Sequence, residues 1–226
     1  MTSPVSRRRF LSRSALAATG GAVLAGGGSG LLSALLPRPA LAAPVVGAAA
    51  PDFSATDIAG RAVRLADLRG RTVVLEWTNH LCPFVMKHYG GGNMQALQRD
   101  YTGKGVVWIT VVSSAEGQQG HVTPEEAQRI VDEAKAAPTH KILDPKGTIG
   151  RAYAAKTTPH MFVIDPAGLL VYDGAIDDRP TARLEDLDGA TSHVRAALDA
   201  TLAGQPVAVP TSQPYGCTIK YAKDAV

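Results

Sequence analysis

The chain has 226 residues and a formal net charge of +3 at neutral pH. The basic excess belongs to residues 1–42, which contain five arginines and no acidic residue, so their removal would leave 18 basic residues against 20 acidic ones. This balance gives no argument for a nucleic-acid partner, and the remaining length suits one domain with its own core. The two cysteines, Cys82 and Cys217, are too few for a cysteine-rich zinc site but permit a disulfide.

The N-terminal segment has the pattern of a cleaved export signal. Residues 6–11 match the twin-arginine motif, a weakly apolar run follows, and Ala40-Leu41-Ala42 supplies a small-x-small cleavage site. A membrane anchor is the alternative, but the run is rich in glycine and poor in bulky apolar side chains. We therefore expect a twin-arginine signal peptide at 1–42, a folded domain at 43–204 and a tail at 205–226. The protein would be periplasmic or otherwise exported, meeting the membrane only during export.

The motif around which the domain is organised runs from a strand into a helix. Residues 72–77 form a short apolar run rich in β-branched side chains, which is typical of a strand covered on both faces. Pro83 fits the first position of the next helix and makes Cys82 its N-cap. Helix N-termini stabilise thiolates and lower cysteine pKa values. Cys82 is therefore the candidate nucleophile, and a small buried hydrophobic residue is the alternative.

The other elements follow from local patterns. Residues 51–67 predict two short extended pieces before the motif, and the helix after Cys82 should break at Gly90-Gly91-Gly92, because each glycine costs roughly 1 kcal/mol there. The pattern next predicts a helix at 94–101, a strand at 106–112 and a polar loop at 113–122. A helix from the Thr123 capping box to 137, an extended piece at 142–144 and a helix at 147–155 should follow. The last predicted elements are a strand at 159–165, its antiparallel return at 169–176, a charged loop at 177–188 and a helix at 190–202. The tail shows no helix or strand pattern.

Three motifs of the mature chain suggest a family. They are Ala50-Pro51-Asp52-Phe53, Cys82-Pro83-Phe84-Val85, and Thr158-Pro159 before a strand. Together they resemble the thioredoxin-like superfamily, and more closely the peroxiredoxin-like redoxins of the alkyl hydroperoxide reductase/thiol-specific antioxidant type. The resemblance implies an α/β, thioredoxin-like fold in which a central mixed β-sheet carries helices on both faces.

The chain departs from both patterns at the second cysteine position. Thioredoxins carry Cys-x-x-Cys, whereas Val85 occupies that place here. Peroxiredoxins put their peroxide-reducing cysteine there, whereas Cys82 matches the first thioredoxin cysteine. The resemblance therefore favours thiol–disulfide exchange, and a thiol-dependent peroxidase is the enzymatic alternative.

The same resemblance implies roles for residues near Cys82. Glu76 matches an acid beneath the active-site corner, where a buried carboxyl with a raised pKa can exchange protons with a thiol, and pairing with Lys or Arg is the alternative. Pro159 matches a cis-proline that faces the cysteine, and the backbone of Thr158 would pair with a bound substrate, with Pro83 beside it. A trans proline that opens a strand is the alternative.

Cys217 has two open roles. It is the candidate resolving cysteine for Cys82, or it forms a static disulfide that would stabilise the fold by about 4–5 kcal/mol in the chain-entropy model. The catalytic set is thus Cys82, Cys217 and Glu76. We expect a protein or small thiol/disulfide substrate, a thiol electron donor of unknown identity, and no nucleic acid.

A copper protein without catalytic activity is the alternative from another class. A thiolate with imidazole neighbours suits copper or zinc, and the candidate ligands around Cys82 are His80, Met86, His88 and His160. The paired cysteines that thioredoxin-like copper proteins use are missing. We therefore assign no metal and no other cofactor.

Overall fold

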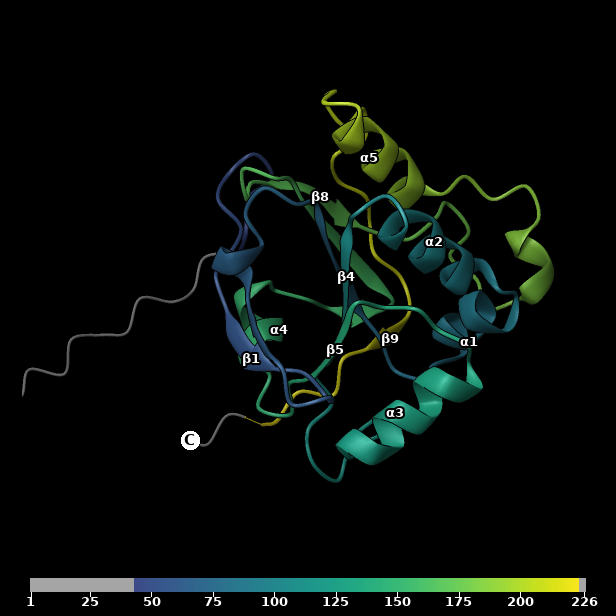
Figure 1. The fold of residues 1–226 in the computed structure, drawn as a ribbon. Helices are drawn as coiled ribbons and strands as arrows, with labels where there is room; N and C mark the ends of the chain where they lie inside the picture. Colours follow the sequence, from purple (N-terminus) through teal and green to yellow (C-terminus); the bar gives the residue numbers. More distant parts are fainter. Residues whose placement is uncertain (1–42, 224–226) are drawn as a thin grey trace, which may run out of the picture. The chain divides into compact units, whose positions relative to one another are not determined.

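The computed structural model describes residues 43–223, and the expected signal peptide lies outside the described residues. A five-stranded sheet with the order β5-β4-β3-β7-β8 forms its centre (Figure 1). Strands β5, β4 and β3 run parallel to one another, β7 runs antiparallel to β3, and β8 runs antiparallel to β7. The strand bounds are β3 (Val73–Trp77), β4 (Val107–Val112), β5 (His140–Leu143), β7 (His160–Ile164) and β8 (Leu170–Gly174). The predicted α/β class with a central mixed sheet is confirmed.

Helices cover both faces of this sheet, so β3 is buried along its whole length. On one face, Val74 of β3 packs in a core with α2 (Asn93–Thr102) and α5 (His193–Leu202). On the other, Leu75 and its neighbours pack with α4 (Thr148–Ala152). The hairpin of β1 (Ser54–Thr56) and β2 (Ala62–Arg64) lies on the α4 side, opposite α2 and α5 (Figure 1). The described residues also contain two 3-10 helices, η1 (Leu65–Leu68) and η2 (Leu184–Leu187).

The predicted break in the helix after Cys82 is confirmed. Helix α1 (Pro83–Gly90) ends within the glycine run, and Gly92 takes a left-handed φ of 72° before α2 begins. A Cβ at Gly91 would collide with the side chain of Leu187, so glycine also lets η2 approach α1 closely.

Helix α3 (Pro124–Glu133) ends before residue 137, where the sequence pattern placed its end. Two glutamine side chains of α2 form hydrogen bonds with backbone groups of the residues that follow α3. Gln95 Nε2 donates to the Ala134 carbonyl at 2.8 Å, and the Ala137 N–H donates to Gln98 Oε1 at 2.8 Å. Tertiary hydrogen bonds thus replace the last helical turn.

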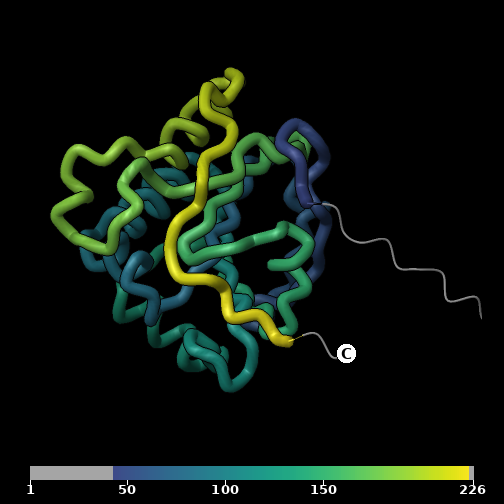
Figure 2. The backbone as a smooth tube through the Cα atoms, turned by 180° about the vertical axis from the view of Figure 1, so that it is seen from behind, coloured from purple at the N-terminus to yellow at the C-terminus, as the bar shows by residue number. Residues whose placement is uncertain are grey.

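The tail is more ordered than its sequence pattern indicated. It contains β9 (Cys217–Thr218), which pairs antiparallel with β6 (Thr157–Thr158), and it crosses the body of the domain (Figure 2). Beyond β9, Ile219 is buried and the Tyr221 hydroxyl donates to the Ala155 carbonyl at 2.8 Å. The tail therefore has a fixed course. No helix within residues 43–223 is long and apolar enough to cross a membrane.

Candidate active site

Cys82 is the N-cap of α1, as predicted, and Pro83 is the first helical residue. The preceding turn is closed by Asn79, whose carbonyl accepts the Cys82 N–H at 3.0 Å and whose Oδ1 accepts the Leu81 N–H at 2.9 Å. The side chain of Cys82 is completely buried. The local sequence thus places the sulfur at a helix N-terminus, and other residues cover it and shield it from solvent.

That cover includes the tail cysteine. The β6–β9 pairing sets Cys217 opposite Thr158, and the two Sγ atoms lie 2.7 Å apart as free thiols. Cys82 Sγ also lies 3.1 Å from the Thr158 carbonyl oxygen. Gly216 has a φ of 132°, and a Cβ there would collide with the same carbonyl, so the close approach needs a glycine.

The two thiols differ in acidity. Burial acts to raise the pKa of Cys82, but hydrogen bonds with the side chains of Cys217 and Thr158 and with the backbone N–H of Val85 outweigh it and lower the pKa. Burial and the neighbouring Cys82 raise the pKa of Cys217 to about 11. Cys82 is therefore the thiol that ionises first, and Cys217 keeps its proton.

The Thr158–Pro159 peptide bond is cis, the geometry that the resemblance implied. Thr158 does present its backbone to a paired strand, but the strand in this structure is β9 of the same chain. The structure thus brings Cys82, Pro83, Thr158 and Cys217 together at one corner.

The hydrogen-bond partners of Glu76 do not belong to this cluster. It is completely buried, and its carboxylate accepts hydrogen bonds from Trp108 Nε1 at 2.8 Å, from the Tyr89 hydroxyl at 2.8 Å and from Gln98 Nε2 at 3.1 Å. Burial raises its pKa, and the three donors and the charge of Lys141 oppose that shift. Its partners are therefore neutral donors on β4, α1 and α2.

Sequence reasoning missed a buried polar network that holds the tail. The Tyr215 hydroxyl donates a hydrogen bond to Asp177. The same hydroxyl is hydrogen-bonded to His88 Nε2 at 3.1 Å and accepts a hydrogen bond from Lys87 Nζ at 3.3 Å. Phe84 packs against the same tyrosine with 5.9 Å between ring centroids. The network ties the residues just before Cys217 to the helix that carries Cys82. The only sequence signal was the aromatic residue in Tyr215-Gly216-Cys217.

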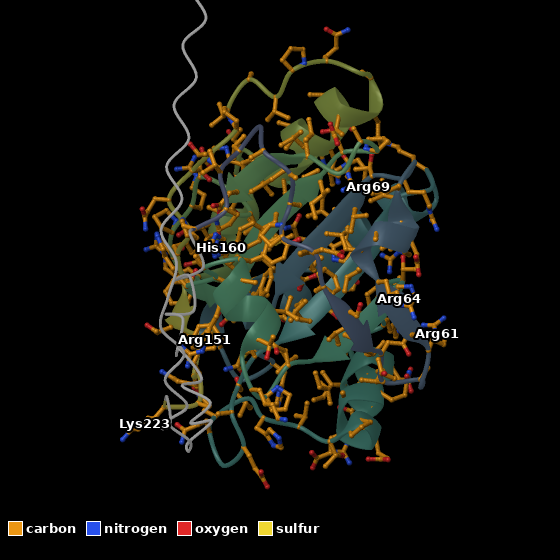
Figure 3. The ribbon with its side chains drawn as sticks, turned by 90° about the vertical axis from the view of Figure 1, so that its left-hand side faces the viewer. Arg61, Arg64, Arg69, Arg151, His160 and Lys223 are labelled. Atoms are coloured by element: carbon orange, nitrogen blue, oxygen red, sulfur yellow. The ribbon has the colours of Figure 1, made fainter. Side chains whose placement is uncertain are left out.

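Two of the three histidines considered as copper ligands, His88 and His160, are hydrogen-bonded to other groups. His88 Nδ1 lies 2.9 Å from Asn93 Nδ2, and its Nε2 is engaged by Tyr215. His160 (labelled in Figure 3) lies 2.7 Å from Asp173 Oδ1 and accepts the Lys156 N–H at 3.2 Å. Within residues 43–223 no group of three or more His, Cys, Asp or Glu side chains is arranged to hold a metal ion.

Comparison with known proteins places this geometry in a family context. The AhpC/TSA family model matches residues 46–173. A hypothetical protein from Sinorhizobium meliloti 1021 is 26% identical with a TM-score of 0.70, over 80% of this chain and 97% of its own. An uncharacterized conserved protein from Geobacillus kaustophilus is 30% identical with a TM-score of 0.70, over 80% and 94%.

A third solved structure has a functional description. A putative thiol:disulfide interchange protein DsbE from Chlorobium tepidum is 27% identical with a TM-score of 0.51, over 69% of this chain and 99% of its own. No curated protein matches. The structural neighbours confirm the thioredoxin-like fold.

Proposed function

Because the chain belongs to the AhpC/TSA family, we propose that it is a thiol–disulfide oxidoreductase in which Cys82 is the nucleophile and Cys217 the resolving cysteine. The observation that carries the proposal is the pair of free thiols 2.7 Å apart at the N-terminus of α1. Their opposite pKa shifts give each sulfur a different task, because the thiolate is the attacking form.

The exchange has two steps. The Cys82 thiolate attacks one sulfur of a substrate disulfide, and the other substrate sulfur leaves as a thiolate that takes up a proton. Cys217 then loses its proton and attacks the Cys82 sulfur of the mixed disulfide, which releases the second substrate thiol. The protein ends with a Cys82–Cys217 disulfide and the substrate with two thiols. The same steps in reverse oxidise a dithiol substrate.

Access to Cys82 requires movement of the tail. Cys82 is completely buried, whereas Cys217 is only partly buried, and β9 occupies the backbone of Thr158. A protein substrate that pairs with Thr158 must therefore displace β9, while a small thiol can attack the Cys217 sulfur of the oxidised form. We propose a protein or small thiol/disulfide substrate and a thiol electron donor, and the similarity to a putative thiol:disulfide interchange protein supports this class.

We also propose that the protein acts outside the cytoplasm, where disulfide exchange is in demand. The support is the twin-arginine motif and the cleavage pattern at Ala40-Leu41-Ala42. Replacing both Arg7 and Arg8 with lysine should leave the precursor in the cytoplasm, as cell fractionation and N-terminal sequencing would show. Unchanged export of that variant, or secreted protein that keeps residues 1–42, would contradict this.

The function is tested with reduced protein and oxidised glutathione, followed by mass spectrometry after thiol trapping. Wild type should form an intramolecular disulfide and release two glutathione molecules per chain. Cys217→Ser should stop at a glutathione adduct on Cys82. Cys82→Ser should react much more slowly, because the thiol at the helix N-terminus is gone and burial still raises the pKa of Cys217.

Three outcomes would contradict the proposal. One is a Cys82→Ser variant that reacts as fast as wild type, and another is a Cys217→Ser variant that accumulates no adduct. The third is oxidation by hydrogen peroxide that far outpaces oxidation by glutathione disulfide, which would identify a thiol peroxidase.

A further inference from the structure

A pocket separate from the two cysteines opens between α1 and α3. Its volume is about 140 Å³, and its floor is formed by Thr110 of β4 and Lys141 of β5. The walls are largely apolar: Val85, Met86, Ile130, Val131, Ala134 and Ala136. A cavity of about 150 Å³ in another protein holds benzene, so this space suits one ring or a short hydrocarbon chain.

The floor holds an unusual charged group. Lys141 is only 8% exposed, yet within the described part of the chain its ammonium has no hydrogen bond or ion pair. Burial lowers the pKa of Lys141. An ammonium carries three donors, and a lysine that is largely removed from water is normally hydrogen-bonded or ion-paired.

Glu76, the acid whose charge acts on Lys141, does not accept a hydrogen bond from it. Glu76, Thr110 and Lys141 occupy one row across β3, β4 and β5, and Glu76 favours the charged form of Lys141 at a distance. Both carboxylate oxygens of Glu76 are, however, occupied by Trp108, Tyr89 and Gln98. The ammonium donors are left for an acceptor in the pocket.

The pocket is also reachable from solvent. A wider groove along the same helices shares His80, Met86 and Tyr89 with it, and Met86 is 56% exposed. We propose that this pocket binds a small organic carboxylate, with its apolar part between α1 and α3 and its carboxylate on Lys141 Nζ. The inference is independent of the thiol chemistry, because Cys82 and Cys217 do not line the pocket.

Benzoate is the probe of choice because it joins one ring to one carboxylate. Its binding is measured by NMR titration against benzamide, which lacks the charge, and benzylamine, which reverses it. Benzoate should bind wild type saturably and more tightly than either analogue. Lys141→Met should weaken benzoate binding about tenfold or more, since a hydrogen-bonded charge pair is lost.

Two further variants test whether benzoate binds in this pocket or responds only to the net charge of the protein. Lys135→Met removes the same charge from an exposed position two residues beyond α3 and should leave benzoate binding unchanged. Ala134→Leu keeps Lys141 but fills the pocket and should abolish binding, with circular dichroism showing that each variant is folded. Absent or non-saturable benzoate binding, equal binding of benzamide, or wild-type affinity in Lys141→Met would overturn the proposal.

Discussion

At the scale of single residues, Glu76 is the side chain whose sequence-based role and observed contacts differ most. A proton partner of Cys82 would shift the pH profile of exchange when replaced by Glu76→Gln. The contacts instead join Glu76 to Trp108, Tyr89 and Gln98. We expect an unchanged profile and a loss of about 1–3 kcal/mol in the free energy of unfolding, because an amide N–H₂ would face other donors.

The measurement pairs urea denaturation with exchange rates across pH. Glu116→Gln, at an exposed position in the loop 113–122, serves as the control and should change neither. A shifted pH profile with little loss of stability would instead make Glu76 the proton partner of Cys82.

His88 makes stability depend on pH. Burial lowers its pKa to about 4, with Lys87 adding to the shift and Asp177 opposing it, whereas an unfolded histidine has a pKa near 6.5. The unfolded state therefore binds more protons, and stability is full above pH 6.5 and is lost as the pH falls toward 4. This residue alone should lower the free energy of unfolding by about 3 kcal/mol over that window.

Denaturation of wild type and His88→Gln at pH 7 and pH 4 measures this effect. The stability difference between the two should shrink as the pH falls, whereas His121→Gln should keep the wild-type slope. Parallel slopes for wild type and His88→Gln would show that His88 is not the titrating group.

Sequence alone found the residues whose role is local. Pro83 marks a helix start by its own backbone chemistry, and that fixes Cys82 as the N-cap. It could not find the contacts of Tyr215 or the pocket around Lys141. The partners of Tyr215 lie 38 or more positions away, and the pocket at Lys141 is assembled from several helices and strands. Such assignments need the tertiary arrangement.

At the scale of elements, β9 is the part that makes the two cysteines neighbours. Gly216→Ala would place a Cβ against the Thr158 carbonyl at a φ of 132°, so β9 should detach from β6. Closure of the Cys82–Cys217 disulfide should then slow by up to about a hundredfold, because the reacting sulfurs lose their alignment.

Mass spectrometry of the glutathione reaction would show this as an accumulating Cys82 adduct. Gly60→Ala is the matched control, since Gly60 also has a positive φ, of 79°, but no atom lies within 4 Å of the position that its new methyl group would take. Wild-type closure in Gly216→Ala would mean that Cys217 reaches Cys82 without the β6–β9 pairing.

Elements with a clear local sequence signal were predicted, whereas those fixed by contacts with distant parts of the chain were not. The buried run of β3 and the capping box of α3 are local signals, which is why β3 and the start of α3 lie where they were expected. A two-residue strand such as β9 has no period, and the early end of α3 depends on Gln95 and Gln98 of another helix.

At the scale of the whole molecule, the tail converts a fold with one helix-cap cysteine into one with a pair. The N-terminus of α1 supplies Cys82, the short strand β6 just before β7 supplies Thr158, and the last segment of the chain supplies Cys217. The fold class was predicted from the resemblance to a known family, and a partnership of Cys217 with Cys82 was predicted as well. The β6–β9 pairing that brings these residues together across 135 positions was not predicted.

The most direct test of this pairing is a redox titration of purified protein in glutathione buffers, with the state of both cysteines read by thiol trapping and mass spectrometry. Stabilisation of the Cys82 thiolate favours the reduced form, so the account predicts one two-electron transition joining Cys82 and Cys217 at a potential above about −300 mV, the upper range of structural disulfides. Two thiols that stay free in fully oxidised buffer, or a bond that persists below about −300 mV, would contradict it.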